Sequence, residues 1–149
     1  MAALIRRQRG RRQQGAELVE FAFVLPLLLF LIAGIIDFGF LFQGYEVITN
    51  AAREGARVGV LPGYADADIQ SRVASYVTTS GLTGTATATV AHRSVPTGTG
   101  PNVSVVDVTV TYPYTMSVLG PIGSLFGGSF GTVTLTSTAT MRTEAGAGS

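Results

Sequence analysis

The chain has 149 residues, enough for one membrane segment and one small domain. It contains no cysteine, which excludes disulfides and thiolate metal sites, and its single histidine and lack of lysine disfavour an enzyme. The net charge is +1, but five of the ten basic residues lie in the first twelve positions, so the rest of the chain is mildly acidic and a nucleic-acid partner is disfavoured.

The first predicted element is a basic leader followed by a long apolar run. The leader carries Arg6, Arg7, Arg9, Arg11 and Arg12. The run from Phe21 to Phe42 has Asp37 as its only charge, and as a helix of about 33 Å it could cross a hydrocarbon core of about 30 Å. Because the arginines precede it, the positive-inside rule places the N-terminus in the cytoplasm and the chain after about residue 45 outside. A buried core helix is disfavoured, since such helices are rarely this long and apolar.

Two residues interrupt the apolar run. Pro26 lacks an N–H and crowds the carbonyl of Ala22, so we expect a kink near the inner leaflet. Asp37 lies towards the outer end of the run. We favour a carboxylate that reaches the polar interface over one that faces a partner within the membrane.

A short motif marks the junction of leader and apolar run. Gly15 and Ala16 are followed by Glu20 and Phe21, which gives the pattern G-x-x-x-x-E-F. This resembles the prepilin processing motif of type IV pilins, especially the Flp group, in which glycine precedes the cut and Glu-Tyr occupies the fifth and sixth mature positions. Phe21 stands where tyrosine is usual. A cut after Gly15 would create an ammonium group on Ala16, one helical turn from Glu20, which could neutralise that carboxylate within one chain or between subunits.

This junction has two other interpretations. An ordinary signal peptide has a shorter apolar region and an A-x-A-like site, and neither is found here. An anchor that is never cut, with Gly15 as a hinge, remains an alternative because short motifs match by chance.

The helix is expected to continue beyond the membrane, from Gln43 to Val60, where Leu61-Pro62-Gly63 supplies a stop. Small residues recur at helical spacing on this part: Ala51, Ala52, Gly55, Ala56 and Gly59. Such a face lets another backbone approach closely, and we favour packing on the protein's own sheet over assembly with other helices. Glu54 is spaced to support Arg57 at i, i+3.

Residues from about 15 to 60 are similar to the TadE-like family of minor pilins or pseudopilins of tight-adherence (Tad/Flp) pilus systems. The matching features are Glu20-Phe21, Leu25-Pro26-Leu27, Asp37-Phe38-Gly39 and Asn50-Ala51-Ala52-Arg53-Glu54. The distal half agrees with the family only in architecture.

The remaining chain predicts a small exported domain. Asp66 is expected to cap a helix that runs to about Thr79 and is ended by Gly81. The expected strands are Thr85–His92, Val103–Tyr112 and Phe130–Met141, with a bulge at Val105-Val106. The predicted fold class is α+β: a long transmembrane helix that extends into a domain with one short helix and an antiparallel sheet of about three to four strands. The short helix should cover the apolar face of the sheet, and the long helix should complete the core.

No catalytic or metal-binding constellation is expected in this domain. His92 has no serine or cysteine partner at an interpretable position, and Asp66 and Asp68 resemble an acidic first helical turn more than a metal site. The loop Ser117–Gly131 carries Leu119, Ile122, Leu125 and Phe126. We favour burial of these side chains under their own loop over docking of a partner. No cofactor, metal or small-molecule substrate is predicted.

The resemblance implies a pilin-like component of Tad/Flp pilus assembly or secretion, in the inner membrane or incorporated into a pilus. Its parts would be a cytoplasmic leader (1–15), a transmembrane and extended helix (16–60) and an exported domain (61–149). Its partners would be membrane lipid, other pilin-like subunits, Tad assembly proteins and a prepilin peptidase. An unprocessed single-pass envelope scaffold or adhesin is the alternative. A tethered periplasmic enzyme that depends on His92 or Asp107 is less favoured.

Overall fold

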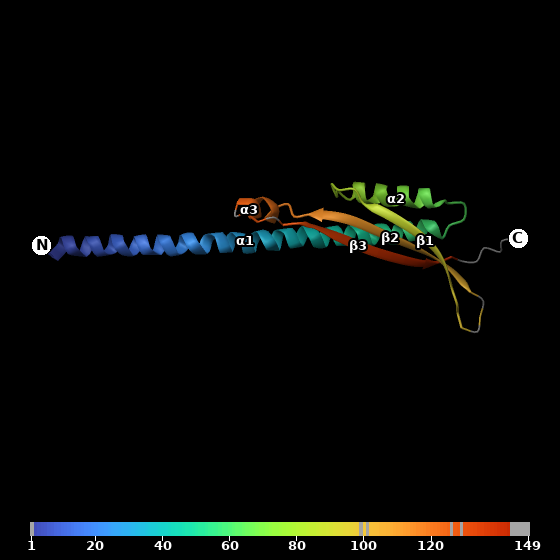
Figure 1. Ribbon diagram of the computed structural model, residues 1–149, viewed down its shortest axis with the longest axis horizontal. Coiled ribbons are helices and arrows are strands. Elements are labelled where there is room, and N and C mark those ends of the chain that lie inside the picture. The colour runs from blue at the N-terminus through green and yellow to red at the C-terminus, as the bar shows by residue number, and fades with distance from the viewer. Residues whose placement is uncertain (1, 99, 101, 126, 129, 144–149) are drawn as a thin grey trace.

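The structure is a computed structural model that describes residues 2–98, 100, 102–125, 127, 128 and 130–143, with side chains from residue 15 onward except that of Leu125. The elements, in order, are α1 (Ala2–Gly59), α2 (Asp66–Thr79), β1 (Thr87–Val95), β2 (Val103–Thr115), α3 (Leu119–Leu125) and β3 (Thr132–Arg142). Figure 1 shows a long rod, formed by α1, whose C-terminal part carries the sheet and the other helices. The α+β fold class predicted from the sequence is confirmed.

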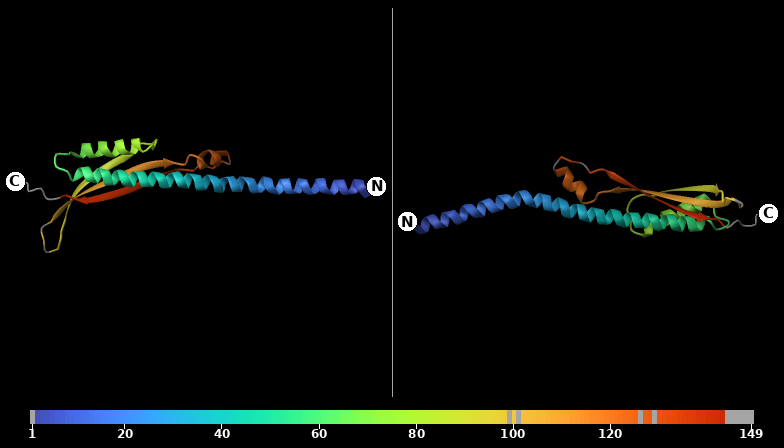
Figure 2. Two further views of the ribbon diagram at one scale, coloured as in Figure 1. Left: turned by 180° about the vertical axis from the view of Figure 1, so that it is seen from behind. Right: turned by 90° about the horizontal axis from the view of Figure 1, so that it is seen from below.

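The long helix α1 is continuous through the leader, the apolar run and the outer extension. It ends at Gly59, as the Leu61-Pro62-Gly63 stop predicts, and Gly63 adopts a left-handed φ of 87°. Seen from below, α1 bends in its blue N-terminal part, the part that contains Pro26 (Figure 2). This bend agrees with the expected kink, because proline removes one helical hydrogen bond and crowds the preceding turn.

The sheet is antiparallel, with the strand order β1-β2-β3. Pairing runs without an inserted residue from Val95↔Val103 to Thr87↔Thr111 and from Thr115↔Thr132 onward, so the bulge predicted at Val105-Val106 is wrong. The core face of β2 starts at Val106 and repeats at every second residue, while Val105 simply lies on the opposite face of the sheet.

The predicted element bounds need further corrections. Strand β1 begins at Thr87 instead of Thr85, and β3 begins at Thr132 instead of Phe130. At their other ends, β1 continues to Val95, β2 to Thr115 and β3 to Arg142, because each strand keeps pairing with its neighbour. The segment Ser117–Gly131, predicted as a loop, contains the helix α3.

The core lies between the sheet and the two longer helices. Helix α1 packs against β2 and β3, α2 packs against β1, and the helices contact each other. The buried apolar side chains of this cluster are Ile48, Ala51, Ala52, Ala56, Val58, Ile69, Val73, Val77, Val106, Val108, Val110, Tyr112, Tyr114 and Leu135. The outer part of α1 therefore completes the core of the small domain, as expected.

Candidate functional site

The predicted processing residues lie on one uninterrupted stretch of α1. Gly15, Ala16, Glu20 and Phe21 are all solvent-exposed, and a Cβ added at Gly15 would meet no atom within 4 Å. Glu20 has no ion pair in the part of the chain that the structure describes. The five leader arginines lie in the helical segment, but their side chains are outside the described part. The structure thus presents an accessible junction and an unpaired carboxylate beside it.

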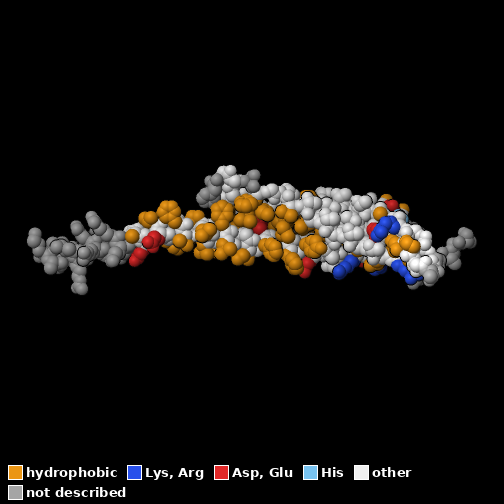
Figure 3. All heavy atoms as spheres, turned by 60° about the horizontal axis from the view of Figure 1, so that its bottom comes forward, with side chains coloured by type: hydrophobic (Ala, Val, Ile, Leu, Met, Phe, Trp, Pro, Cys, Tyr) orange, Lys and Arg blue, Asp and Glu red, His pale blue; other side chains and the backbone are white. Residues whose placement is uncertain are grey.

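The apolar run beyond this junction exposes large hydrophobic side chains around the helix, among them Phe23, Leu27 and Phe38. In the space-filling view, hydrophobic side chains cover the helix between an acidic end and the domain that carries the arginines (Figure 3). The helix is long and apolar enough to cross a membrane by length and composition. Exposure of this kind suits contact with lipid or with other apolar helices rather than with water.

Asp37 is the buried polar centre of this region, with 2% of its surface exposed. Its carboxylate accepts backbone N–H groups from Ser117 at 3.0 Å, Val118 at 3.1 Å and Leu119 at 2.6 Å. The Tyr114 hydroxyl donates to Asp37 Oδ1 at 3.3 Å. The interpretation of Asp37 as a carboxylate at the polar interface is therefore wrong: it caps the start of α3 in its own chain, where a carboxylate satisfies free N–H groups.

A groove of about 360 Å³ lies between the apolar run and the segment that Asp37 holds. Its walls are apolar, and they are formed by Leu25, Pro26, Leu29, Ile32, Ala33, Ile36, Val118 and Ile122. Leu119 and Ile122, expected to tuck under their own loop, are half-buried. Phe126 and the side chain of Leu125 lie outside the described part.

The small-residue face of α1 is used inside the protein. Ala51, Ala52 and Ala56 are completely buried, and Gly55 and Gly59 complete the same face. A Cβ at Gly55 would lie 2.7 Å from Val73 Cγ2 and 3.1 Å from Val108 Cγ1. A Cβ at Gly59 would lie 2.9 Å from Val106 Cγ1. This agrees with the expected packing on the protein's own sheet, and it also brings in α2, which contributes Val73.

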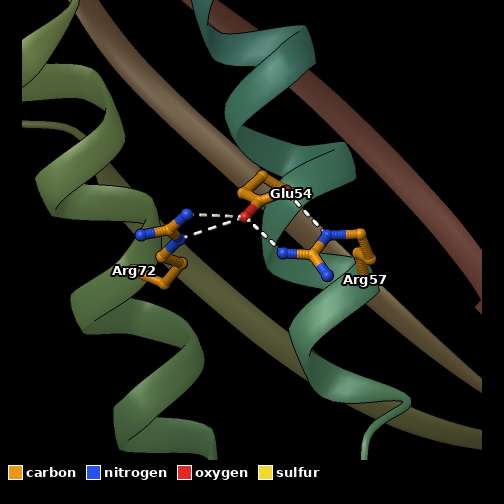
Figure 4. Close-up of polar contacts among 3 residues, drawn as sticks. All are labelled: Glu54, Arg57 and Arg72. Atoms are coloured by element: carbon orange, nitrogen blue, oxygen red, sulfur yellow. Dashed lines mark hydrogen bonds and ion pairs between the residues drawn. The ribbon is translucent and has the colours of Figure 1, made fainter.

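A charged triad joins the two longer helices on their outer side (Figure 4). Glu54 lies between Arg57, on its own helix, and Arg72 of α2, with N–O distances of 2.8 and 2.9 Å. The hydrogen bonds from Arg57 and then from Arg72 lower the pKa of Glu54 to about 2. The Glu54–Arg57 pair was predicted from its spacing, whereas Arg72 was not, because it belongs to another element.

The distal polar residues form structural pairs. Asp107 is bound by Arg93, and Thr140 donates to it at 2.6 Å; these two hydrogen bonds, that of Arg93 foremost, lower the pKa of Asp107. His92 Nε2 contacts Asp66 Oδ1 at 2.8 Å, so it ties β1 to the start of α2. The predicted capping role of Asp66 is wrong, since α2 starts at Asp66 itself and the carboxylate that accepts the Ala65 N–H is that of Asp68.

Among the described residues, no group of three or more His, Cys, Asp or Glu side chains could hold a metal ion. The carboxylates with partners are engaged in caps and ion pairs.

The sequence carries a signal for the burial of Asp37. Asp37, Leu41, Gly44 and Ile48 follow one another at steps of three or four, and all four are buried or partly buried. Asp37 therefore lies on the stripe of α1 that faces the domain. Its partners, about 80 positions further along the chain, could not be identified from that pattern.

Comparison with known families gives one match: the TadE-like protein family model matches residues 15–57. The matched segment lies wholly within α1 and confirms the resemblance stated from the sequence. No curated protein and no solved structure matches the chain.

The match indicates a Tad pilus-related component whose single apolar helix fits a single-pass membrane anchor. A pilin-like family of this kind implies contacts with the membrane and with other pilus subunits, and it is not a family of enzymes.

Proposed function

We propose that this TadE-like chain is a pilin-like subunit of a Tad/Flp pilus-assembly or secretion apparatus, and that α1 is the element through which it assembles. The observation that carries the proposal is the family match, which begins at Gly15 and covers the exposed apolar helix. The distal domain, which the match does not cover, would be the exported part.

Processing after Gly15 by a prepilin peptidase forms part of the proposal. The junction is exposed, and open space surrounds Gly15. The ammonium group created on Ala16 would lie one turn from Glu20, whose carboxylate has no ion pair in the described residues. A charge at the membrane boundary gains several kcal/mol from such a partner, in the same chain or on a neighbouring subunit.

The proposed topology follows the charge distribution. The Arg-rich leader, residues 1–15, stays in the cytoplasm until it is removed, α1 crosses the inner membrane within residues 16–60, and the domain of residues 61–149 lies outside.

The structure narrows the surface available for assembly. The small residues at 51–59 pack against the protein's own sheet and α2, so they are not free to receive another subunit. The exposed apolar side chains between Leu18 and Phe42 are the remaining large apolar surface of α1. We assign helix–helix assembly to this stretch, which contacts lipid before assembly and other subunits after it.

The test is genetic complementation in the organism that makes the protein. Deletion of the gene should abolish or reduce surface pili, and the wild-type gene should restore them. The Gly15→Val variant should accumulate in the membrane and fail to restore pili, because a bulky side chain blocks the processing site. A leader variant such as Gln8→Ala, which leaves Gly15 intact, is the control and should restore pili.

Two results would contradict the proposal. Normal pili after deletion of the gene would show that the protein is not needed for assembly. Full complementation by Gly15→Val would favour the alternative of an unprocessed membrane scaffold or adhesin.

A further inference from the structure

The connection between β2 and β3 lies beside α1 at the level of its apolar run. Val118 and Ile122 share the groove with Ile32 and Ile36. At 1.5 Å per residue, Ile36 lies about 9 Å and Ile32 about 15 Å inside the outer end of the run at Phe42. If α1 spans the membrane with the domain outside, α3 lies at the depth of the outer-leaflet acyl chains.

The composition of this connection suits that depth. No charged residue occurs between Asp107 and Arg142, which is the longest uncharged stretch of the exported domain. Helix α3 and the residue before it present Val118, Leu119, Pro121 and Ile122. In hydrocarbon, a single charge on this surface would cost about 2.5–3.5 kcal/mol, so its absence removes the main obstacle to immersion.

Backbone N–H groups at the start of α3 also have an acceptor within the protein. The first N–H groups of a helix have no partner within the helix, and in lipid each one would cost several kcal/mol. Here the carboxylate of Asp37 accepts the N–H groups of Ser117, Val118 and Leu119. The buried acid and the free helix start therefore satisfy each other within the apolar region.

At the end of α3, two backbone carbonyls accept hydrogen bonds from the residues that follow the helix. The Gly128 N–H donates to the Gly123 carbonyl at 3.0 Å, and the Gly127 N–H donates to the Ser124 carbonyl at 3.2 Å. Gly127 has a φ of 74°, which completes a Schellman-type end that glycine adopts without strain. The Ser124 hydroxyl donates to the Pro121 carbonyl at 2.7 Å, so this side chain also needs no water.

We propose that residues 117–125 form a re-entrant element that enters the outer leaflet beside α1, and that lipid acyl chains fill the groove between them. Irregular backbone is tolerated at membrane depth only where its polar groups are satisfied by the protein. Three N–H groups at the start of α3 and two carbonyls at its end meet this condition. The groove continues the lipid-facing surface of α1 and has apolar walls throughout. This inference rests on the proposed function, since it requires α1 to be a membrane span.

Depth-resolved fluorescence tests the proposal, because the chain contains no tryptophan. The Ile122→Trp variant of the full chain is reconstituted in phosphatidylcholine vesicles with or without brominated acyl chains. Phe23→Trp, within the span, and Thr89→Trp, at an exposed position of β1, are the matched controls. We expect brominated lipid to quench Ile122→Trp to within twofold of the quenching of Phe23→Trp, and to leave Thr89→Trp unchanged. Aqueous iodide should quench only Thr89→Trp.

The controls separate the possible failures. If iodide quenches Ile122→Trp while brominated lipid quenches Phe23→Trp, α3 lies in water. This inference is then overturned, whereas the proposed function stands. If Ile122→Trp is shielded from both quenchers, protein and not lipid fills the groove. That result also overturns this inference. If brominated lipid fails to quench Phe23→Trp, α1 is not a membrane span and the proposed function fails with it.

A smaller substitution guards against misfolding of the tryptophan variant. The chain has no cysteine, so Ile122→Cys and Thr89→Cys each introduce a single thiol. In intact vesicles with the domain outside, a membrane-impermeant maleimide should label Thr89→Cys and spare Ile122→Cys. If the carboxylate of Asp37 holds α3 in the membrane, adding Asp37→Asn should make Ile122→Cys accessible to the maleimide. Equal labelling of Thr89→Cys and Ile122→Cys in the protein that keeps Asp37 would overturn the proposal.

Discussion

The carboxylate of Asp37 accepts the backbone N–H of Leu119 at 2.6 Å, across a sequence separation of 82 residues. The bond joins the apolar run of α1 to the connection between β2 and β3. It adds to the contacts that Leu41, Ile48 and the small-residue face of α1 make with the domain. Asp37 therefore attaches this connection to α1.

Replacement of Asp37 by Ala should release this connection. The variant leaves three N–H groups without their acceptor, so we expect the free energy of unfolding to fall by about 2–4 kcal/mol. In detergent micelles, limited proteolysis between residues 115 and 131 should become faster. Glu46→Ala removes an exposed acid from the same helix and is the control. Equal proteolysis of Asp37→Ala and the wild type would show that the bonds to Asp37 do not hold the connection.

Gly55 should not tolerate even a methyl group. Its Cβ would lie 2.7 Å from Val73 Cγ2, so Gly55→Ala should destabilise the domain by about 1–3 kcal/mol despite the better helix propensity of alanine. Gly39→Ala is the matched control on α1, because a Cβ there meets nothing within 4 Å. Thermal unfolding of the two variants in the same detergent compares them. Similar melting temperatures would contradict the close approach of α1 to α2 and the sheet.

The Glu54 triad should make stability depend on pH in a defined window. The folded-state pKa of about 2 lies below the ordinary glutamate value of 4.5, so the stabilisation is fully present above about pH 4.5 and is lost as the pH falls towards 2. Because the triad is partly exposed, we expect Glu54→Gln to cost only about 1 kcal/mol at pH 7. Denaturant unfolding at several pH values should show this difference shrinking below pH 4.5. A difference that stays constant down to pH 2 would mean that the charge of Glu54 contributes nothing.

His92 provides a test of the enzymatic alternative. Its contact with Asp66 is an exposed pair that links β1 to α2. We therefore expect His92→Ala to leave pilus formation and the fold unchanged, as measured by complementation and circular dichroism. Loss of pili with an unchanged fold would point to a chemical role of His92.

Local patterns predicted the parts of the fold that depend on neighbouring residues. Helix α2 ends at Thr79 as expected and starts one residue before the position that a cap at Asp66 implied, because its apolar stripe and the glycine that ends it are nearby in sequence. The Glu54–Arg57 pair was likewise predictable from its spacing. The prediction of a bulge in β2 was wrong, because a pair of valines occurs as readily in a strand with apolar residues on both faces as in a bulge.

The parts that sequence reasoning missed depend on distant partners. Helix α3 is short, contains Gly120 and Pro121, and has a weak pattern of its own. Its start is stabilised by Asp37 from the other end of the fold. The pattern around α3 does not indicate Asp37, and the pattern around Asp37 does not indicate α3. For this reason the sequence favoured a carboxylate at the polar interface over a buried cap. Arg72 completes the triad in the same way, from a helix whose position on α1 only the fold determines.

Cleavage after Gly15 can be measured by the intact mass of the protein purified from the membranes of its own cells. We expect a chain that begins at Ala16, having lost the leader that contains all five N-terminal arginines, and a full-length chain in cells without prepilin peptidase. A protein that keeps residues 1–15 in cells with an active peptidase would contradict the account.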